Sequence, residues 1–370
     1  MTTARRRTST DILSQRALNR ALLARQLLLR RWSLSAYETI ERLVAMQAQV
    51  PNSPYVGLWT RLTRFRPIEL ANLITSRRAV RLALLRSTIH LVTDRDCLGL
   101  RPILQPYLER HFYTGTPFGR QVRGVDTSRL VSAARALLDE KPRTVAELGT
   151  LLHDQWPDRD QTSLAYAIRE LVPLVQVPPR GVWGAGGQSR CATAEHWLGR
   201  PLEGNPSPEL MVLRYLRAFG PSTVSDVQAW SGPNLRSVIE GLRPRLRTFR
   251  DESGRELLDV PDAPLPDPDV PAPPRFLPEY DNILLAHADR SRVIAVPFRP
   301  AIFTSSLLLD GFVAATWKIV RLPGRARLVI ESFKPMRVAD REAVGEEGMR
   351  LLAFAASDAS DHDIQFKRAA

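Results

Sequence analysis

Two glutamines, Gln47 and Gln49, stand one residue apart, close to a point where a helix has to end. Side chains two positions apart point to opposite sides of a helix but to the same side of an extended segment. Because Pro51 disfavours helical backbone at Val50, the two amides can converge on one target. Their carbonyl oxygens can orient a water molecule or stabilise a positive charge, but they are poor proton acceptors. The alternative is a polar helix end whose amides cap its own carbonyl groups.

The residues before this Gln-Ala-Gln triplet predict the helix that leads into it. Ile40, Leu43, Val44 and Gln47 recur at helical spacing, which predicts a helix over residues 36–47. The backbone must then become extended within the triplet itself.

Other kinds of chemistry have little support in the sequence. The six histidines show neither an HExxH motif nor another spacing typical of metal ligands. Cys97 and Cys191 are too few for a disulfide framework or a cysteine zinc site. No phosphate-binding loop, dinucleotide-binding loop or GxSxG elbow is present. We therefore expect no metal and no cofactor.

The 370 residues, 44% of them hydrophobic, are enough for two to four modules with buried cores. No apolar run approaches the ~18 residues of a membrane helix. The arginine-rich N-terminus also lacks the apolar stretch of a signal peptide. We expect a cytoplasmic protein that does not bind a membrane.

The formal net charge is +13, and only four of the 52 basic residues are lysines. Codon usage in a GC-rich genome explains the preference for arginine, but it does not explain the net charge. Arginine makes forked contacts to phosphate and base edges that lysine cannot make. The charge therefore indicates a polyanionic partner, most simply nucleic acid.

Three segments share one order of parts: a helix, two shorter helices and a β-hairpin. In the third segment these parts are residues 209–219, 223–230, 234–242 and the strands 246–250 and 256–260. In the second they are residues 130–138, 144–148, 162–171 and the strands 174–177 and 181–184. In the first, helices over 13–29, 36–47 and 68–76 precede a β-rich stretch, 80–92. This order is the winged-helix plan of DNA-binding proteins.

An acidic, proline-rich stretch, residues 256–274, ends the third segment and enters a linker, and the chain after it is β-rich. Predicted strands 275–286 and 293–296 flank a basic hairpin tip, residues 287–292. The remaining predicted elements are strands 307–309, 312–320 and 327–333 and a closing helix, 339–355. The sequence thus predicts an α+β fold of four parts: winged-helix units 1–125, 126–200 and 201–262, and a β-rich domain 263–370.

Six stretches carry a family resemblance: residues 16–26, the triplet with Pro51, Pro54 and Tyr55, and residues 86–90, 276–281, 287–292 and 310–317. They resemble the bacterial winged-helix DNA glycosylases, the family of AlkZ and YcaQ, which unhook alkylated or crosslinked DNA. The catalytic element of that family is a Gln-hydrophobic-Gln or Gln-hydrophobic-Asp triplet, and a family hairpin approaches the DNA. The resemblance therefore implies that Gln47 and Gln49 are catalytic. It also implies a set of DNA-binding residues: Tyr55, Arg86, His90, His287, Asp289, Arg290 and Arg292.

The implied chemistry suits these residues. Hydrolysis of an N-glycosidic bond passes through an oxocarbenium-like sugar. An N7-alkylated purine already carries a positive charge and leaves readily, so two amide oxygens suffice to orient water and stabilise the cation. A lyase step usually needs an amine nucleophile. No lysine lies near the triplet in the sequence, which favours a monofunctional hydrolase.

We expect a monomeric DNA glycosylase that removes cationic N-alkylpurines from duplex DNA. Its substrates would extend to interstrand crosslinks, in repair or in self-resistance to a genotoxin. The alternative is a non-catalytic winged-helix DNA-binding protein, such as a transcriptional regulator, which would have no need of the two glutamines. A structural scaffold without a nucleic-acid role is disfavoured by the net charge.

Overall fold

The computed structural model describes residues 11–295, 297–298 and 303–368. Helices and three separate sheets make up the fold, so the predicted α+β class is confirmed. No helix within these ranges has both the length and the hydropathy of a membrane span.

The first segment begins with α1 (Gln15–Arg25) and α2 (Ala36–Arg42). The hydroxyls of Ser14 and Ser35 cap the two helices by accepting backbone N–H bonds. The predicted extent of the second helix, 36–47, is wrong, because α2 stops at Arg42 and Val44 takes a left-handed φ of 69°. Two further helices follow, α3 (Ser53–Trp59) and α4 (Pro67–Thr75).

A six-stranded sheet joins the first two segments. Its strands, in spatial order, are β2 (Met46–Gln47), β4 (Ile89–Thr93), β3 (Ala79–Ala83), β6 (Leu174–Gln176), β7 (Arg190–Thr193) and β5 (Arg143–Thr144). The strand predicted at 181–184 is wrong, because these residues lie in the loop between β6 and β7. β3 and β6 pair antiparallel, so the β-strands of the two segments form one continuous surface.

Helices from the end of the first unit and from the second segment cover one end of this sheet. They are α5 (Asp94–Gly115), α6 (Pro117–Gln121), α7 (Thr127–Glu140), α8 (Val145–His153), α9 (Gln161–Leu171) and α10 (Ala194–Leu198). α5, with 22 residues, has no counterpart among the predicted helices. A short 3₁₀ turn, η1 (Leu85–Ser87), connects β3 to β4.

The third segment has the predicted order of elements. Its helices are α11 (Pro208–Phe219), α12 (Val224–Ser231) and α13 (Arg236–Leu242), followed by η2 (Arg243–Arg245) and the hairpin β8 (Arg247–Asp251) and β9 (Glu256–Asp259). Thr223 and Asp226 form a capping box at the start of α12. A short strand near the N-terminus, β1 (Ile12–Leu13), adds to β8 in parallel.

The C-terminal part is a five-stranded sheet covered by a helix. Its strands are β10 (Arg275–Leu277), β11 (Ser306–Leu309), β12 (Phe312–Leu322), β13 (Arg325–Ser332) and β14 (Asp361–Arg368). α15 (Val338–Ala355) matches the predicted closing helix. The predicted hairpin around residues 287–292 is wrong: its first strand is β only at β10, α14 (Asn282–Leu285) follows within the same stretch, and residues 293–295 form no strand. Val296, in the predicted second strand, lies outside the described residues.

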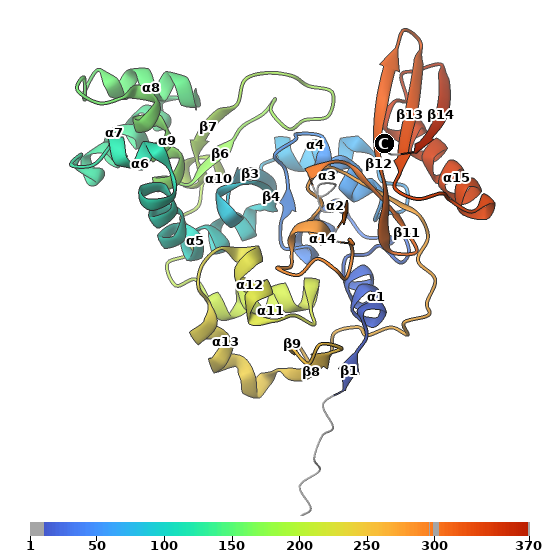
Figure 1. Ribbon diagram of the computed structural model, residues 1–370. Helices are drawn as coiled ribbons and strands as arrows, with labels where there is room; N and C mark the ends of the chain where they lie inside the picture. Colours follow the sequence, from blue (N-terminus) through green and yellow to red (C-terminus); the bar gives the residue numbers. More distant parts are fainter. Residues whose placement is uncertain (1–10, 296, 299–302, 369–370) are drawn as a thin grey trace, which may run out of the picture.

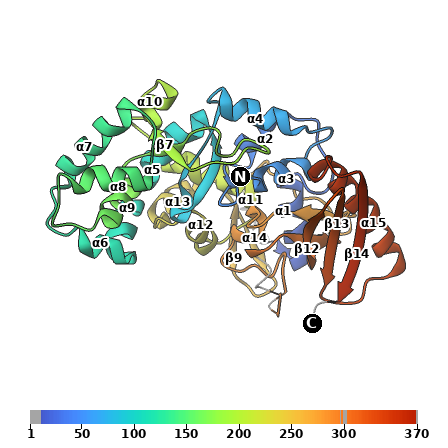
Figure 2. The same ribbon diagram turned by 90° about the horizontal axis from the view of Figure 1, so that it is seen from above.

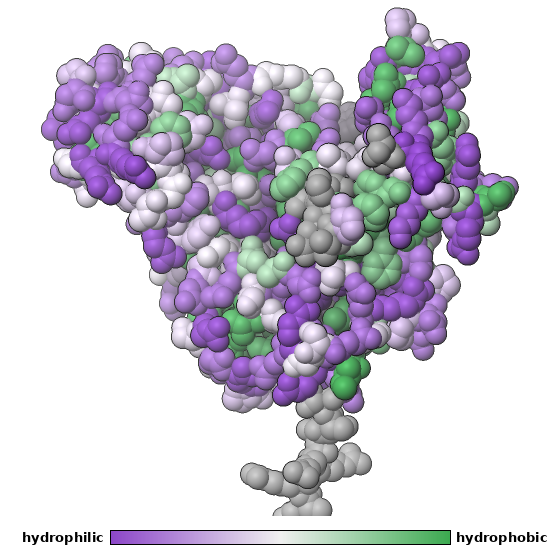
Figure 3. All heavy atoms as spheres, viewed as in Figure 1, coloured by the Kyte–Doolittle hydropathy of each residue, from purple (hydrophilic) through white to green (hydrophobic). Residues whose placement is uncertain are grey.

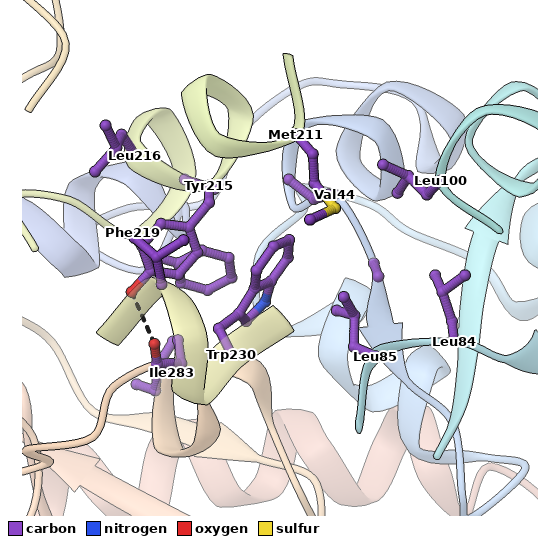
Figure 4. Close-up of a cluster of buried hydrophobic side chains, with 14 of the residues drawn as sticks. Val44, Leu84, Leu85, Leu100, Met211, Tyr215, Leu216, Phe219, Trp230 and Ile283 are labelled. Carbon is purple, nitrogen blue, oxygen red and sulfur yellow. Dashed lines mark hydrogen bonds between the residues drawn. The ribbon is translucent and has the colours of Figure 1, made fainter. Parts of the chain in front are cut away.

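The hydrophobic cores cross the predicted boundaries near residues 201 and 263. The largest cluster combines Leu84 and Leu100 with Tyr215 and Trp230 of the third segment and Ile283 of the C-terminal part (Figure 4). A second cluster packs the first segment against the C-terminal sheet, and among the described residues only the second segment has a core mainly of its own. Packing therefore fixes the first and third segments and the C-terminal part against one another.

Two lobes extend from this shared body. One carries α6–α9, and the other carries β12–β14 with α15 (Figure 1). Seen from above, they lie at opposite ends of the molecule with α2, α3 and α11 between them (Figure 2). Hydrophilic residues cover most of the first lobe and of the β12–β13 projection on the face in Figure 3.

Candidate active site

The triplet begins in the extended strand β2, as predicted, the Ala48 N–H donates to the Ile89 carbonyl, and both amides meet residues at the start of β4. Gln47 in β2 lies opposite His90 of β4. The Thr88 hydroxyl shares its single hydrogen between Gln47 Oε1, at 3.2 Å, and the Leu85 carbonyl, at 3.1 Å, and the Ile89 N–H donates to Gln49 Oε1 over 3.3 Å. The helix-capping alternative is wrong, since the helix has ended at Arg42 and the amides bond to Thr88 and Ile89 instead.

The two glutamines differ in their exposure. The Gln47 residue is 7% exposed, whereas Gln49 is exposed. An amide oxygen has two lone pairs, and each of these oxygens uses one of them on its bond from Thr88 or Ile89. Each oxygen can therefore accept one further hydrogen bond, for example from a water molecule.

Arg81, a buried residue of β3, holds the triplet backbone in place. Its Nη2 donates to the Ala48 carbonyl over 2.8 Å, its Nη1 to the Pro51 carbonyl over 3.3 Å, and its Nε to Gln176 Oε1 over 3.2 Å. Burial, followed by the nearby charge of Arg180, lowers the pKa of Arg81 to about 10. Within the described ranges no carboxylate forms an ion pair with Arg81. Its charge is thus directed at carbonyl groups around the triplet.

Tyr55 is a buried residue that holds the loop packed against Arg81. It is fully buried, and burial raises its pKa to about 12. Its hydroxyl donates to the Gly181 carbonyl over 2.9 Å and accepts from the Trp183 N–H over 3.0 Å. Gly181 has φ +89°, and a Cβ there would come within 2.6 Å of Arg81 Cδ. The prediction that Tyr55 contacts DNA is therefore corrected: it anchors the loop that packs on Arg81.

Asn282 is a contact of the triplet that the sequence did not reveal. Its Oδ1 accepts from the Gln47 N–H over 3.2 Å, and its Nδ2 donates to the Ala45 carbonyl. The preceding residue, Asp281, forms a buried bidentate pair with Arg61 at 2.8 and 2.9 Å. Its only sequence signal is its position directly after the family-like stretch 276–281.

The η1 turn beside the triplet has an unusual backbone. Arg86 and Ser87 both take left-handed φ values, 53° and 56°, which non-glycine residues rarely adopt. Arg86 donates to the Trp230 carbonyl, and its pKa falls to about 10, mainly through burial and also through nearby Arg290. The Ser87 hydroxyl donates to both oxygens of Glu170, a second contact that the sequence did not reveal.

His90 is buried against the triplet and does not reach DNA. Its ring Nδ1 lies 2.9 Å from the Thr88 carbonyl, and its exposed fraction is 1%. Burial, helped by the charge of Arg86, lowers the His90 pKa to about 3. The prediction of a DNA contact is corrected here too: His90 is a neutral residue behind the two amides.

Residues 287–292 pack inward instead of forming an exposed tip. His287 is 1% exposed and its Nε2 bonds to the Phe219 carbonyl, while Arg292 is 6% exposed and donates to the Pro221 carbonyl. Asp289 pairs with Arg255 at 2.7 Å. Burial therefore gives His287 and Arg292 structural roles, whereas Asp289 is partly exposed and its predicted DNA contact stays a prediction. Arg290 is half-buried and lies close enough to Arg86 to depress its pKa. Arg86 and Arg290 remain as candidate phosphate contacts.

Comparison with known proteins supports the class that the sequence resembles, the DNA glycosylases. The family model described as DNA glycosylase AlkZ-like matches residues 40–354. The chain therefore belongs to the AlkZ-like DNA glycosylase family, which confirms the resemblance seen in the sequence and implies a DNA substrate.

The structure is similar to that of the DNA glycosylase AlkZ of Streptomyces sahachiroi. The TM-score is 0.76 at 21% sequence identity, and the match covers 96% of this chain and 100% of that one. At this identity the match supports the fold. No curated protein matches the chain.

Proposed function

We propose that this protein hydrolyses the N-glycosidic bond of cationic N-alkylpurines in duplex DNA, with Gln47 and Gln49 as its catalytic residues. The observation that carries the proposal is the convergence of both amide oxygens on Thr88 and Ile89. This arrangement places two neutral acceptors side by side, and each has a lone pair left for water or for a developing positive charge.

The reaction needs no strong acid or base at this site. The bond between C1′ and the purine nitrogen breaks, and its electron pair neutralises the charge of the alkylated base. Water held by one amide oxygen adds to C1′ and releases a proton to solvent, while the other oxygen faces the oxocarbenium-like sugar.

The same residues limit the substrate to purines that are already charged. An uncharged purine has to be protonated as it leaves, so its hydrolysis requires a general acid. His90 has a pKa of about 3 and is neutral at pH 7, whereas the buried Tyr55, with a pKa of about 12, bonds to the loop at Gly181. Neither side chain is suited to supply that proton.

The enzyme is proposed to be a monofunctional hydrolase that acts as a monomer. The four lysines, at 141, 318, 334 and 367, all lie outside the segments that contact the triplet. A Schiff-base lyase step therefore lacks its amine. The three helix–hairpin segments are proposed to act as winged helices, and Arg86 with Arg290 to bind a backbone phosphate.

Base release from alkylated DNA tests the proposal. Gln47→Ala and Gln49→Ala should each slow release of N7-methylguanine by at least ~10-fold, or about 1.4 kcal/mol of barrier. Gln49→Asp should keep partial activity, because a carboxylate also orients water and stabilises a cation. Gln155→Ala, an exposed glutamine on another lobe, is the matched control.

Two outcomes would contradict the proposal in different ways. Wild-type rates in both alanine variants would remove the triplet from catalysis. A wild-type protein that releases no cationic purine, and no nitrogen-mustard crosslink, would favour the DNA-binding regulator. Release from monoadducts but not from crosslinks would restrict the substrate without affecting the mechanism.

A further inference from the structure

A buried carboxylate from the second segment reaches the turn beside the triplet. Glu170, at the end of α9, is 4% exposed, and both its oxygens accept from the Ser87 hydroxyl, at 2.8 and 2.9 Å. Arg169 adds a bond to the Ser87 carbonyl at 3.4 Å, and its Nε lies 3.8 Å from Glu170 Oε1. Arg101 fixes the Glu170 backbone by donating to its carbonyl over 2.9 Å. The carboxylate is thus immobilised and directed at a single hydroxyl.

That hydroxyl belongs to a turn whose backbone costs free energy. Arg86 and Ser87 are consecutive non-glycine residues in the left-handed region, a conformation that persists only when surrounding contacts enforce it. The two residues that follow make the contacts to the amides, Thr88 to Gln47 and Ile89 to Gln49. Relaxation of the turn would therefore move both donors away from the amide oxygens.

We propose that Glu170 is a positioning residue for the glutamine pair. It holds Ser87 in its left-handed conformation, so that Thr88 and Ile89 keep both amide oxygens oriented toward one target. This inference rests on the proposed function. In this proposal two segments contribute to the active site, because α9 belongs to the second segment and the triplet to the first.

The geometry distinguishes positioning from a direct chemical role. Both carboxylate oxygens face the Ser87 hydroxyl, and the link from Glu170 to the triplet runs through the backbone of residues 87–89. A residue that acts in this way should change the rate of base release without adding an ionisation to it. The pH profile of the reaction should therefore keep its shape when Glu170 is replaced.

The test uses single-turnover release of N7-methylguanine by the full chain, together with the Kd for the same DNA. Glu170→Ala and Ser87→Ala should each slow release by about 10-fold or more, with an unchanged Kd, while Glu170→Gln keeps an acceptor and should lose less. Ser87→Gly in the Glu170→Ala background should restore most of the rate, because glycine adopts the left-handed conformation without support. Glu346→Ala, an exposed glutamate of α15, is the control.

Backbone exchange of the Ile89 amide gives a readout that does not depend on activity. This N–H is held by Gln49 Oε1 and should exchange faster in Glu170→Ala than in the wild type. Unchanged exchange, or unchanged base release in a variant of an active enzyme, would overturn the inference. The inference would also be overturned if Glu170→Ala were slow, lost one ionisation from its pH–rate profile and were not rescued by Ser87→Gly. That result would show that Glu170 takes part in proton transfer. An inactive wild type would refute the proposed function alone, and Ile89 exchange would still decide whether Glu170 holds the turn.

Discussion

Replacing Arg81 by methionine should destabilise the protein and slow base release separately. The change removes three donated hydrogen bonds, two of them to the Ala48 and Pro51 carbonyls. A hydrogen bond from a charged donor contributes about 1.5–3 kcal/mol, so about 6 kcal/mol is lost. Burial opposes this loss, because the fall of the Arg81 pKa to about 10 corresponds to a penalty of about 3 kcal/mol on the charged form. The net loss of stability should be about 3 kcal/mol.

The loss of activity should exceed what unfolding explains. Without Arg81 the triplet backbone loses its main anchor, and a misplacement of about 1 Å at a reacting group costs on the order of 100-fold in rate. Urea unfolding measures the stability, and single-turnover release of N7-methylguanine, at a temperature where the variant is folded, measures the rate. Gln47 and Gln49 are unchanged in this variant, so a slower rate reports their position.

Arg275→Met provides a matched control. Arg275 is also a buried arginine whose pKa burial lowers to about 10, and its Nε donates to the Leu28 carbonyl, away from the triplet. The control should lose stability but retain the wild-type rate when folded. If folded Arg81→Met releases the base as fast as Arg275→Met, the claim that Arg81 positions the triplet is refuted.

Four further outcomes are expected. The pKa values of His90 and His287, both about 3, lie below the ordinary value of 6.5, so the unfolded chain takes up protons that the folded one does not. Urea unfolding should show both contributions intact above about pH 6.5, and each should be about 1.4 kcal/mol smaller at about pH 5.5 than at pH 7.5. Arg290→Ala should flatten the salt dependence of DNA binding by about 0.9 in the log–log slope. Arg292→Ala should instead lower the melting temperature and leave that slope unchanged, because Arg292 is buried. Gly181→Ala should slow base release, since its Cβ would displace Arg81, and a wild-type rate would contradict this.

Elements with local signals were predictable from the sequence. The third segment was predicted with its order intact, because Gly220 and Thr223 mark the boundary between α11 and α12 and a four-residue turn ends at Gly254. α5 escaped prediction because Pro102 and Pro106 lie within it, although its leucine face is buried. β14 was not predicted because it pairs with β13, and α15 separates these two strands in the sequence.

The candidate site divides in the same way. The triplet carries its own signal, two glutamines before a proline, and its extended backbone was predictable. The burial of His287 and Arg292 was not, because their partners Phe219 and Pro221 lie about 70 residues earlier in the chain. For the same reason the sequence did not predict the roles of Arg81, Asn282 and Glu170. Each of them contacts the triplet or the η1 turn only in the folded structure.

The charges around the triplet suit a reaction with a cationic transition state. A positive charge facing the sugar would oppose bond cleavage, yet a DNA-binding protein needs arginines nearby. The guanidinium of Arg81 donates hydrogen bonds to backbone carbonyls of the triplet segment, so its positive charge does not face the sugar. Burial keeps His90 neutral, so no protonated imidazole lies beside Gln47. Arg86 lies in the turn with Arg290 nearby, and we propose that a phosphate neutralises them. In our proposal, the protein therefore binds the polyanion with cations around the site and faces the reacting sugar with neutral amides.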